Sequence, residues 1–207
     1  MRALPDGARV VKSRRPQLIS VFDGLGSKVV PIREVTLRPF DEELDSPRLW
    51  EWLRRPHVAE WWGDAQQELQ EVLASSPDTS AVIVADGVPV GHLFWQRLPP
   101  DEREAAGLSD LPDDLVDIDI MIGEPEMTGQ GVGPTALGLL LARLRGDALV
   151  SFAAVGTSLS NGAAIRAFEK AGFRPFRDFE DREWGPCRYM VAELRPDEAG
   201  LRMEPRR

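Results

Sequence analysis

Cysteine and histidine are scarce in this chain of 207 residues, and their scarcity excludes several kinds of site. Cys187 is the single cysteine, so no disulfide can form within the chain and no cysteine-based zinc site is possible. The two histidines, His57 and His92, are too few for most metal clusters, so we expect no metal. The low cysteine usage also fits a cytoplasmic setting.

Long apolar runs are missing as well. No segment approaches the roughly 18 consecutive apolar residues of a membrane span, and the N-terminus has no apolar stretch typical of a signal peptide. We therefore expect no membrane partner. Hydrophobic residues nevertheless make up 43% of the chain, which is enough for one good core.

Positive charge is concentrated at the N-terminus, while the chain as a whole has a net charge of −9. Residues 1–33 hold seven Lys or Arg and two Asp or Glu, a net charge of +5, which leaves −14 for the remainder. An acidic body repels phosphate, so we expect no nucleic-acid partner. The charge suits a small cationic partner, although a need for solubility explains it equally well.

Apolar residues alternate or recur with regular periods between residues 34 and 195, which predicts one folded domain there. Residues 1–33 are interpreted as a basic, flexible arm, residues 98–114 as a long loop and residues 196–207 as a tail. The element order βααβββαβαβ, with a terminal strand, predicts an α/β fold, an α+β sandwich around a mixed sheet. Strands are predicted at 34–38, 80–85, 90–95, 116–122, 149–154 and 188–192, and helices at 41–52, 68–73, 136–145 and 163–171.

A glycine-rich turn at 128–133 (Thr-Gly-Gln-Gly-Val-Gly) separates the predicted strand at 116–122 from the predicted helix at 136–145. Backbone N–H groups and the positive end of a helix dipole favour a phosphate at such a place, and glycines let it approach closely. The chain has no Gly-Lys-Ser/Thr sequence, so neither ATP nor GTP is expected. The alternative is a glycine-lined loop that only permits tight packing.

The turn is followed by a second motif, residues 160–173 (Ser-Asn-Gly-Ala-Ala-Ile-Arg-Ala-Phe-Glu-Lys-Ala-Gly-Phe). In this order the two segments resemble the Gln/Arg-x-x-Gly-x-Gly and Asn-x-x-Ala-x-x-x-Tyr-Glu-Lys-x-Gly-Phe motifs of the GNAT superfamily of N-acetyltransferases. Residues 57–63, 118–119 and 189–191 are similar to aminoglycoside 6′-N-acetyltransferases in particular. The resemblance implies a GNAT fold, with a mixed, mostly antiparallel sheet flanked by helices.

The resemblance also implies acetyl-CoA as the cosubstrate. In this family the pyrophosphate lies on the amides of the glycine-rich turn, and the pantetheine arm lies along the strand before it, with an asparagine hydrogen-bonded to the arm. The implied donor-binding residues are Met121, Ile122, Gly129, Gln130, Gly131, Val132, Gly133, Pro134, Thr135, Asn161, Ala164 and Phe168.

Transfer in this family is direct, from thioester to amine in a ternary complex, so the amine must lose a proton. Asp119 matches the carboxylate that the aminoglycoside enzymes place beside the reacting amine, and Asp117 is the second candidate. The family's usual tyrosine acid is replaced by Phe168, which cannot donate a proton, so the proton for the thiolate comes from water, from another group such as Tyr189, or is not supplied. A further acceptor-binding carboxylate of the family falls at about Gly156 here.

The stretch around Glu60 resembles the substrate lid of these enzymes, where an indole stacks on a sugar ring or holds a cation. A tryptophan that only anchors the core is the alternative. The implied acceptor-binding residues are Glu60, Trp61, Trp62, Trp95, Asp117 and Asp119.

The predicted function is acetylation of an amino group of an aminoglycoside-like antibiotic, kasugamycin-type compounds included, and hence antibiotic resistance. Two alternatives stay open. One is a GNAT enzyme for another small amine or a siderophore-related acceptor. The other is a non-catalytic acyl-CoA-binding module, which Phe168 keeps open. We expect a monomer or a homodimer.

Overall fold

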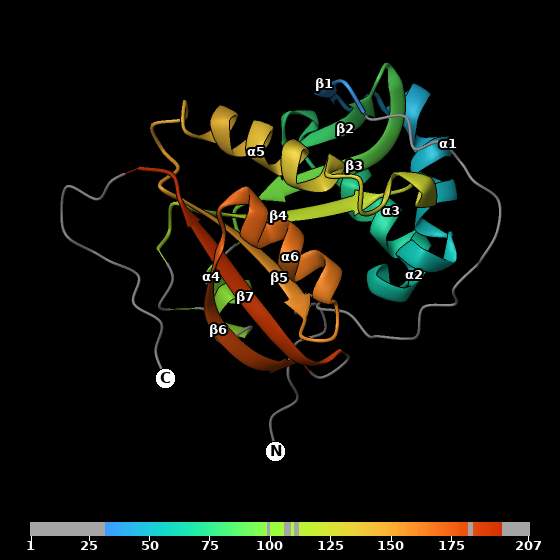
Figure 1. Cartoon of the computed structure of the whole chain (residues 1–207). Helices are drawn as coiled ribbons and strands as arrows, with labels where there is room; N and C mark the ends of the chain where they lie inside the picture. Colours follow the sequence, from blue (N-terminus) through green and yellow to red (C-terminus); the bar gives the residue numbers. More distant parts are fainter. Residues whose placement is uncertain (1–31, 99, 106–108, 110–111, 182–183, 196–207) are drawn as a thin grey trace.

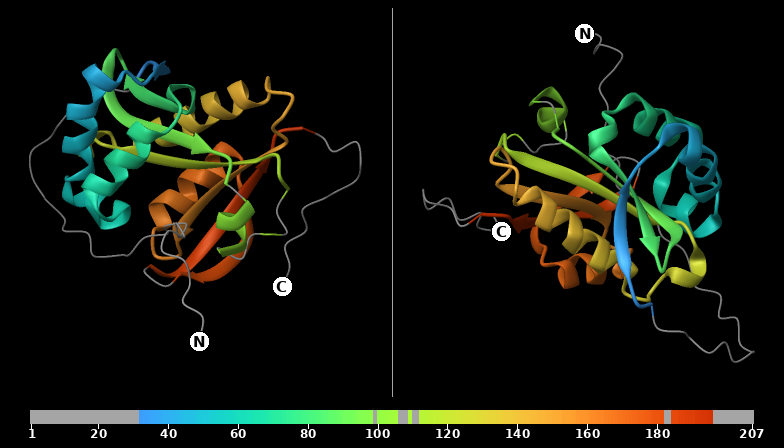
Figure 2. Two further views of the ribbon diagram at one scale, coloured as in Figure 1. Left: turned by 180° about the vertical axis from the view of Figure 1, so that it is seen from behind. Right: turned by 90° about the horizontal axis from the view of Figure 1, so that it is seen from above.

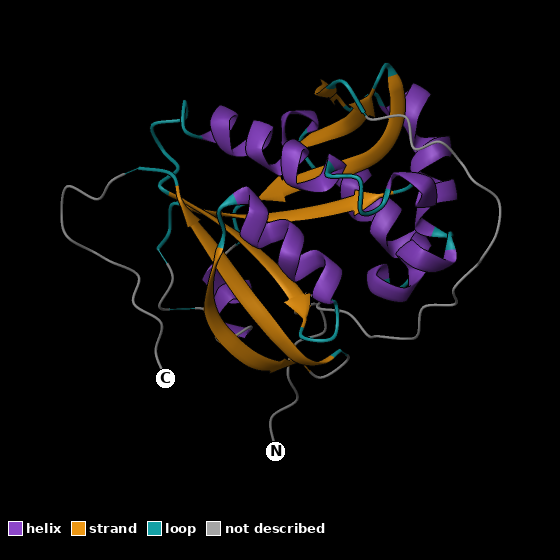
Figure 3. Cartoon of the chain, viewed as in Figure 1, coloured by secondary structure: helices purple, strands orange, loops and turns teal. Residues whose placement is uncertain are grey.

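The computed structural model describes residues 32–98, 100–105, 109, 112–181 and 184–195. The predicted tail at 196–207, and all but the last two residues of the predicted arm at 1–33, lie outside the described residues. The division into arm, domain and tail stays a prediction. In the described part, one sheet carries helices on both faces (Figures 1 and 3).

The sheet of the described residues follows the strand order β1-β2-β3-β4-β5-β7-β6. β4 and β5 run parallel, and the other neighbouring strands run antiparallel, which confirms the mixed, mostly antiparallel sheet. The strands are β1 (Val35–Pro39), β2 (Ser80–Ala85), β3 (Val88–Gln96), β4 (Leu115–Ile122), β5 (Phe152–Ser158), β6 (Arg174–Asp181) and β7 (Gly185–Glu193).

Two groups of helices cover the sheet, one on each face (Figure 2). The first group packs its apolar side chains against β2 and β4, and the second group buries the larger core of the molecule. The first group is α1 (Glu42–Leu53), α2 (Pro56–Trp62) and α3 (Ala65–Ala74), the second is α5 (Val132–Leu144) and α6 (Gly162–Ala171), and α4 (Pro100–Ala105) lies between β3 and β4 in the chain.

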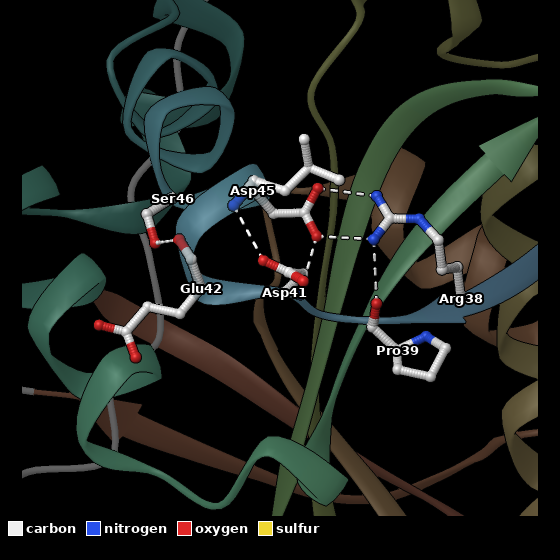
Figure 4. A network of polar contacts seen from close by, with 7 residues as sticks. Arg38, Pro39, Asp41, Glu42, Asp45 and Ser46 are labelled. Carbon is white, nitrogen blue, oxygen red and sulfur yellow. Dashed lines mark hydrogen bonds and ion pairs between the residues drawn. The ribbon is translucent and has the colours of Figure 1, made fainter.

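A polar network fixes the start of α1 against β1 (Figure 4). Asp41 caps the helix, because its Oδ1 accepts a hydrogen bond from the Leu44 N–H at 2.9 Å. The guanidinium of Arg38 on β1 donates to both carboxylate oxygens of the buried Asp45, each at 2.7 Å. This two-point contact joins the first helical group to the edge of the sheet.

β4 and β5 separate before they end, and this separation makes room for a site. Their register runs from Leu115 opposite Phe152 only as far as Asp117 opposite Ala154. Beyond these residues the two strands diverge, so the second half of β4 has no neighbour in the sheet on this side (Figure 1).

Several elements of the structure differ from the prediction, and one of them is α2, for which no helix was predicted. The strand predicted at 149–154 begins at Phe152, because a turn holds residues 147–150 and leaves Leu149 69% exposed. The predicted loop at 98–114 contains α4, whose six residues are too few to show a helical period. No range is predicted for β6, because a register shift between Pro175 and Arg177 breaks the alternation of its side chains.

Candidate active site

From β4 the chain continues through a short 3-10 turn, η2 (Pro125–Met127), and then through the glycine-rich turn into α5. Gly129 and Gly131 have φ values of 73° and 83°, the left-handed region that glycine adopts without strain. A Cβ added at either position would meet no heavy atom within 4 Å, so the backbone conformation, not crowding, demands glycine.

The start of α5 is suited to an anion. Gly131 is the N-cap of the helix, and no side chain accepts a hydrogen bond from the first turn. The N–H groups of Val132 and Gly133 therefore lie at the positive end of a helix of 13 residues. This is the arrangement that binds phosphate groups.

A cavity of about 370 Å³, here called the donor cavity, opens over this turn and continues along β4 towards α6. The structure brings most of the predicted donor-binding residues together in its wall. Those that line it are Met121, Ile122, Gly129, Gly131, Gly133, Pro134, Asn161, Ala164 and Phe168.

The other three predicted donor-binding residues lie beside the donor cavity. Val132 is buried in the core under the helix. The side chain of Gln130 donates to the Glu126 carbonyl at 2.9 Å, and that of Thr135 donates to the Gly131 carbonyl at 2.8 Å. Any contact that Val132 or Thr135 makes with an anion is thus made by the backbone.

Asn161 has a structural role at the start of α6. Its Oδ1 accepts a hydrogen bond from the Ala164 N–H at 3.1 Å, which makes Asn161 the cap of the helix. The side-chain Nδ2 is therefore the group through which Asn161 would donate to a pantetheine arm.

A smaller cavity of about 50 Å³, here called the acceptor cavity, adjoins the donor cavity where β4 and β5 separate. Asp119 lines it from β4, Gly156 and Thr157 line it from β5, and the two tryptophans of α2 line it from across the cleft. Both cavities share Trp61, Trp62, Ile120, Asn161, Ala164 and Phe168. A carboxylate thus lines the cavity that adjoins the donor cavity.

Asp117 lies behind Asp119 on β4, outside both cavity walls. It is 7% exposed, and the hydroxyl of Tyr189 donates to its Oδ1 at 2.7 Å. Burial and the charge of Asp119 raise the pKa of Asp117 to about 7, although the Tyr189 hydrogen bond acts in the opposite direction.

Tyr189, the predicted source of a proton for the thiolate, does not line either cavity. It is the single tyrosine of the chain, 0% exposed, and its proton is already donated to Asp117. Burial, and then the Asp117 charge, raise the pKa of Tyr189 well above its ordinary value. The structure therefore places Tyr189 where it contacts Asp117 and not where a thiolate would lie.

Two predicted acceptor-binding residues are also outside the acceptor cavity. Trp95 is 5% exposed and is opposite Ile118 in the β3–β4 register, so it faces α5 in the main core. Asp117 and Asp119 face the other side of the sheet, because side chains alternate along a strand. Glu60 is half-buried on α2 but does not line either cavity.

Several further residues line the cavities without having been predicted as site residues, among them His57, Met127 and Thr157. His57 lines the donor cavity, and its Nε2 lies 3.0 Å from the Ile122 carbonyl, which joins α2 to the end of β4. Met127 precedes the glycine-rich turn and lines the donor cavity, and Thr157 lines the acceptor cavity. No pattern in the sequence marks them, although Met127 and Thr157 lie close to the two motifs.

The comparison with known families accounts for this arrangement. Residues 41–181 match the acetyltransferase (GNAT) domain. The chain belongs to the GNAT acetyltransferase family. Membership confirms the predicted enzyme class, an acetyl-CoA-dependent N-acetyltransferase with acetyl-CoA as cosubstrate.

Relatives of this GNAT protein include enzymes named for aminoglycosides. The aminoglycoside N(6′)-acetyltransferase type 1 of Klebsiella pneumoniae is 31% identical over 167 residues, which cover 76% of this chain and 82% of the relative. The crystal structure of the aminoglycoside acetyltransferase AAC(6′)-Ib with coenzyme A has a TM-score of 0.65 at 27% identity, over 77% of this chain and 95% of that one. The same values hold for its complex with coenzyme A and kanamycin.

Two kinds of site have no counterpart in the part of the chain that the structure describes. No helix there is long and apolar enough to cross a membrane. No group of three or more His, Cys, Asp or Glu side chains gathers there as a metal site requires.

Proposed function

We propose that this GNAT protein transfers the acetyl group of acetyl-CoA to an amino group of an aminoglycoside-like antibiotic, and so confers resistance. The observation that carries the proposal is the position of Asp119. Its carboxylate lines the acceptor cavity, which shares six wall residues, among them its chain neighbour Ile120, with the donor cavity. The 31% identity to an aminoglycoside N(6′)-acetyltransferase supports the same acceptor class.

The chain supplies the donor half of the reaction mainly through its backbone. The N–H groups at the start of α5 would hold the pyrophosphate, since Gly129 and Gly131 leave the approach open. The unpaired edge of β4 near Met121 and Ile122 would accept the pantetheine arm as a neighbouring strand is accepted.

Asp119 has two roles in the acceptor half. Its negative charge attracts the ammonium group of the acceptor, and its carboxylate then takes the proton that this group must lose before attack. The nitrogen forms a bond to the acetyl carbon as the bond from that carbon to sulfur breaks. The sulfur leaves as a thiolate, and the nitrogen loses its second proton as the amide forms. Phe168 in the donor cavity cannot give a proton to the thiolate, so this second proton passes to the sulfur through water.

The two tryptophans of α2 bound the acceptor cavity opposite Asp119. Both line the two cavities, but Trp62 is buried in the core formed by α1–α3, whereas Trp61 is only partly buried against that core. Trp61 therefore has the ring that can stack on a sugar of the acceptor.

A second candidate is acetylation of a simpler amine. Asp119 is the one acidic residue among those that line the acceptor cavity, since Gly156 provides no carboxylate. A single carboxylate is enough for an acceptor with one ammonium group, so this observation favours a small monoamine.

The test is thiol release from acetyl-CoA with aminoglycosides and simple amines as parallel acceptors. We expect release with aminoglycosides, and Asp119→Asn is expected to lower kcat by about 10²–10⁴-fold, the usual contribution of a general base. Affinity for coenzyme A should stay unchanged, because Asp119 does not line the donor cavity. Release with simple amines alone contradicts the antibiotic substrate, and coenzyme A binding without release contradicts the enzyme.

The cellular location and the assembly of the protein are also part of the proposal. A cytoplasmic location is supported by the single cysteine, Cys187, which is buried and has no partner for a disulfide within the chain. The assembly as a monomer or a homodimer stays a prediction.

A further inference from the structure

A second carboxyl group stands behind the one that faces the acceptor. Asp117 and Asp119 are two residues apart on β4, so their side chains share one face of the sheet and their Cα atoms lie about 7 Å apart. Asp119 reaches the acceptor cavity, whereas Asp117 stays behind it, buried. The charge of Asp119 is one of the influences on Asp117, so the two carboxyls interact.

The surroundings of Asp117 offer little compensation for a buried charge. Gln96 on β3 and Ala154 on β5 are its register neighbours, and both are uncharged. The titratable groups that act on it are Asp119, which repels its charge, and Tyr189, which donates one hydrogen bond. On β6, Arg174 is opposite Val191, the β7 register neighbour of Ala154, and Arg177 is opposite Tyr189, with its guanidinium 5.2 Å from the Phe176 ring.

Such a group lowers the stability of the fold whenever it is ionised. Burying a carboxylate with one neutral donor is unfavourable, and a like charge nearby makes it more so. An uncharged residue that accepts the Tyr189 hydrogen bond would avoid this cost. Residues that reduce stability in this way gather at functional sites.

We propose that Asp117 is a positioning residue for acetyl transfer: its carboxyl, held by the Tyr189 hydroxyl, stands behind Asp119 and sets how strongly Asp119 draws the proton from the acceptor amine. The inference rests on the proposed role of Asp119. In the step concerned, the N–H bond of the ammonium breaks and the proton goes to Asp119. Asp117 does not touch the acceptor and acts through Asp119 alone.

The direction of the effect follows from charge. When Asp117 is ionised, its negative charge makes Asp119 a stronger base. When Asp117 is protonated, one charge is left and Asp119 is a weaker base. Two carboxyls that interact in this way titrate as a pair, so the activity should follow the charge of the pair.

The first test is the pH dependence of kcat/KM for wild type, Asp117→Asn, Tyr189→Phe and the control Glu51→Gln. The control removes one exposed negative charge on α1, at a residue that is far from the pair in the sequence and lines neither cavity. Wild type and control are expected to show a rise in kcat/KM near neutral pH. Asp117→Asn should lack that rise. At pH values above the rise, its kcat/KM should be about tenfold lower than that of wild type, as expected for two charges about 7 Å apart.

Tyr189→Phe should displace the rise in kcat/KM along the pH axis and not remove it. It removes the hydrogen bond that favours the ionised form of Asp117, so the rise should move to higher pH. A merely structural role for the pair predicts an equal loss at every pH in both variants, and that result would overturn the inference. The melting temperature of each variant shows whether it is folded.

The second test needs no acceptor. Carbon-13 NMR of labelled aspartate carboxyls, measured on the enzyme alone, should show a titration near neutral pH that Asp117→Asn removes, together with a lowered pKa for Asp119. If Asp119 titrates identically in both proteins, the inference fails and acetyl transfer by Asp119 still stands. If the pair is coupled but no aminoglycoside is acetylated, the proposed function fails and the coupling stands.

Discussion

Two glycines with nearly the same backbone conformation allow the donor site to be tested separately from the stability of the fold. Gly131 in the glycine-rich turn has a φ of 83°, and Gly87 in the β2–β3 turn has a φ of 82°. A Cβ added at either residue meets no heavy atom within 4 Å. Gly131 lines the donor cavity, whereas Gly87 lines neither the donor nor the acceptor cavity. The two alanine variants should therefore have the same backbone strain, and only the variant at Gly131 places its methyl group in the wall of the donor cavity.

The conformational cost can be worked out. An alanine in the left-handed region destabilises the folded state by about 1–2 kcal/mol. Alanine also gives the unfolded chain less conformational entropy than glycine does, which offsets a smaller part of this cost, so the free energy of unfolding should fall by about 1 kcal/mol. The melting temperature of both Gly131→Ala and Gly87→Ala should fall by about 2–4 °C.

Only Gly131→Ala should weaken donor binding. Its methyl group stands in the wall of the donor cavity at the N-terminus of α5, and a displaced phosphate loses a hydrogen bond from a backbone N–H. Such charged hydrogen bonds are worth about 1.5–3 kcal/mol, which corresponds to a roughly tenfold to hundredfold weaker affinity. Calorimetric titration of both variants with coenzyme A measures this affinity. Equal affinities for the two variants would refute the assignment of the phosphates to this turn.

Two further predictions concern the fold that holds the site. Gly123→Ala should lower the free energy of unfolding by about 1–3 kcal/mol or more, since a Cβ there would lie 2.1 Å from Cγ of the buried Trp52, whose Nε1 donates to Glu124 at 2.9 Å. Gly138→Ala in α5 is its control, because a Cβ there meets nothing within 4 Å, and a thermal melt in which both variants lose the same stability would contradict the account. His92 is fully buried beside Ser80, and burial lowers its pKa to about 3. Between about pH 6.5 and pH 3, His92 is therefore protonated in the unfolded chain but stays neutral in the folded chain. The free energy of unfolding should fall by up to about 1.4 kcal/mol per pH unit as the pH drops through this range. Urea unfolding of wild type and His92→Gln across this range isolates the effect from that of Asp117, whose raised pKa acts in the opposite direction, and parallel pH profiles would refute it.

The donor half of the site could be predicted because its signals are local in the sequence. The glycines of the turn report a backbone conformation, and Asn161 and Gly172 mark the two ends of α6, where the structure places its cap and a left-handed residue. Such features depend on a few neighbouring residues. The strands at 80–85 and 116–122 were predictable for the same reason, the first from a short apolar run and the second from alternation.

The acceptor half depends on contacts between distant segments, which a single sequence does not reveal. The hydrogen bond from Tyr189 to Asp117 joins residues 72 positions apart. Which tryptophans face the cleft is decided by the register of β3 on β4, and this register turns Trp95 towards α5. The acceptor cavity exists because β4 and β5 part after Asp117, and no residue type marks that point.

Acetyl transfer to an aminoglycoside amine at the two adjoining cavities can be followed as a change in the mass of the acceptor. Kanamycin is incubated with acetyl-CoA and either wild type or Asp119→Asn, and the products are analysed by mass spectrometry. We expect wild type to form kanamycin that carries one added acetyl group on an amine, and Asp119→Asn to form much less of it. Kanamycin that stays unmodified in the presence of wild type that binds coenzyme A, or equal acetylation by Asp119→Asn, would rule out the proposed function.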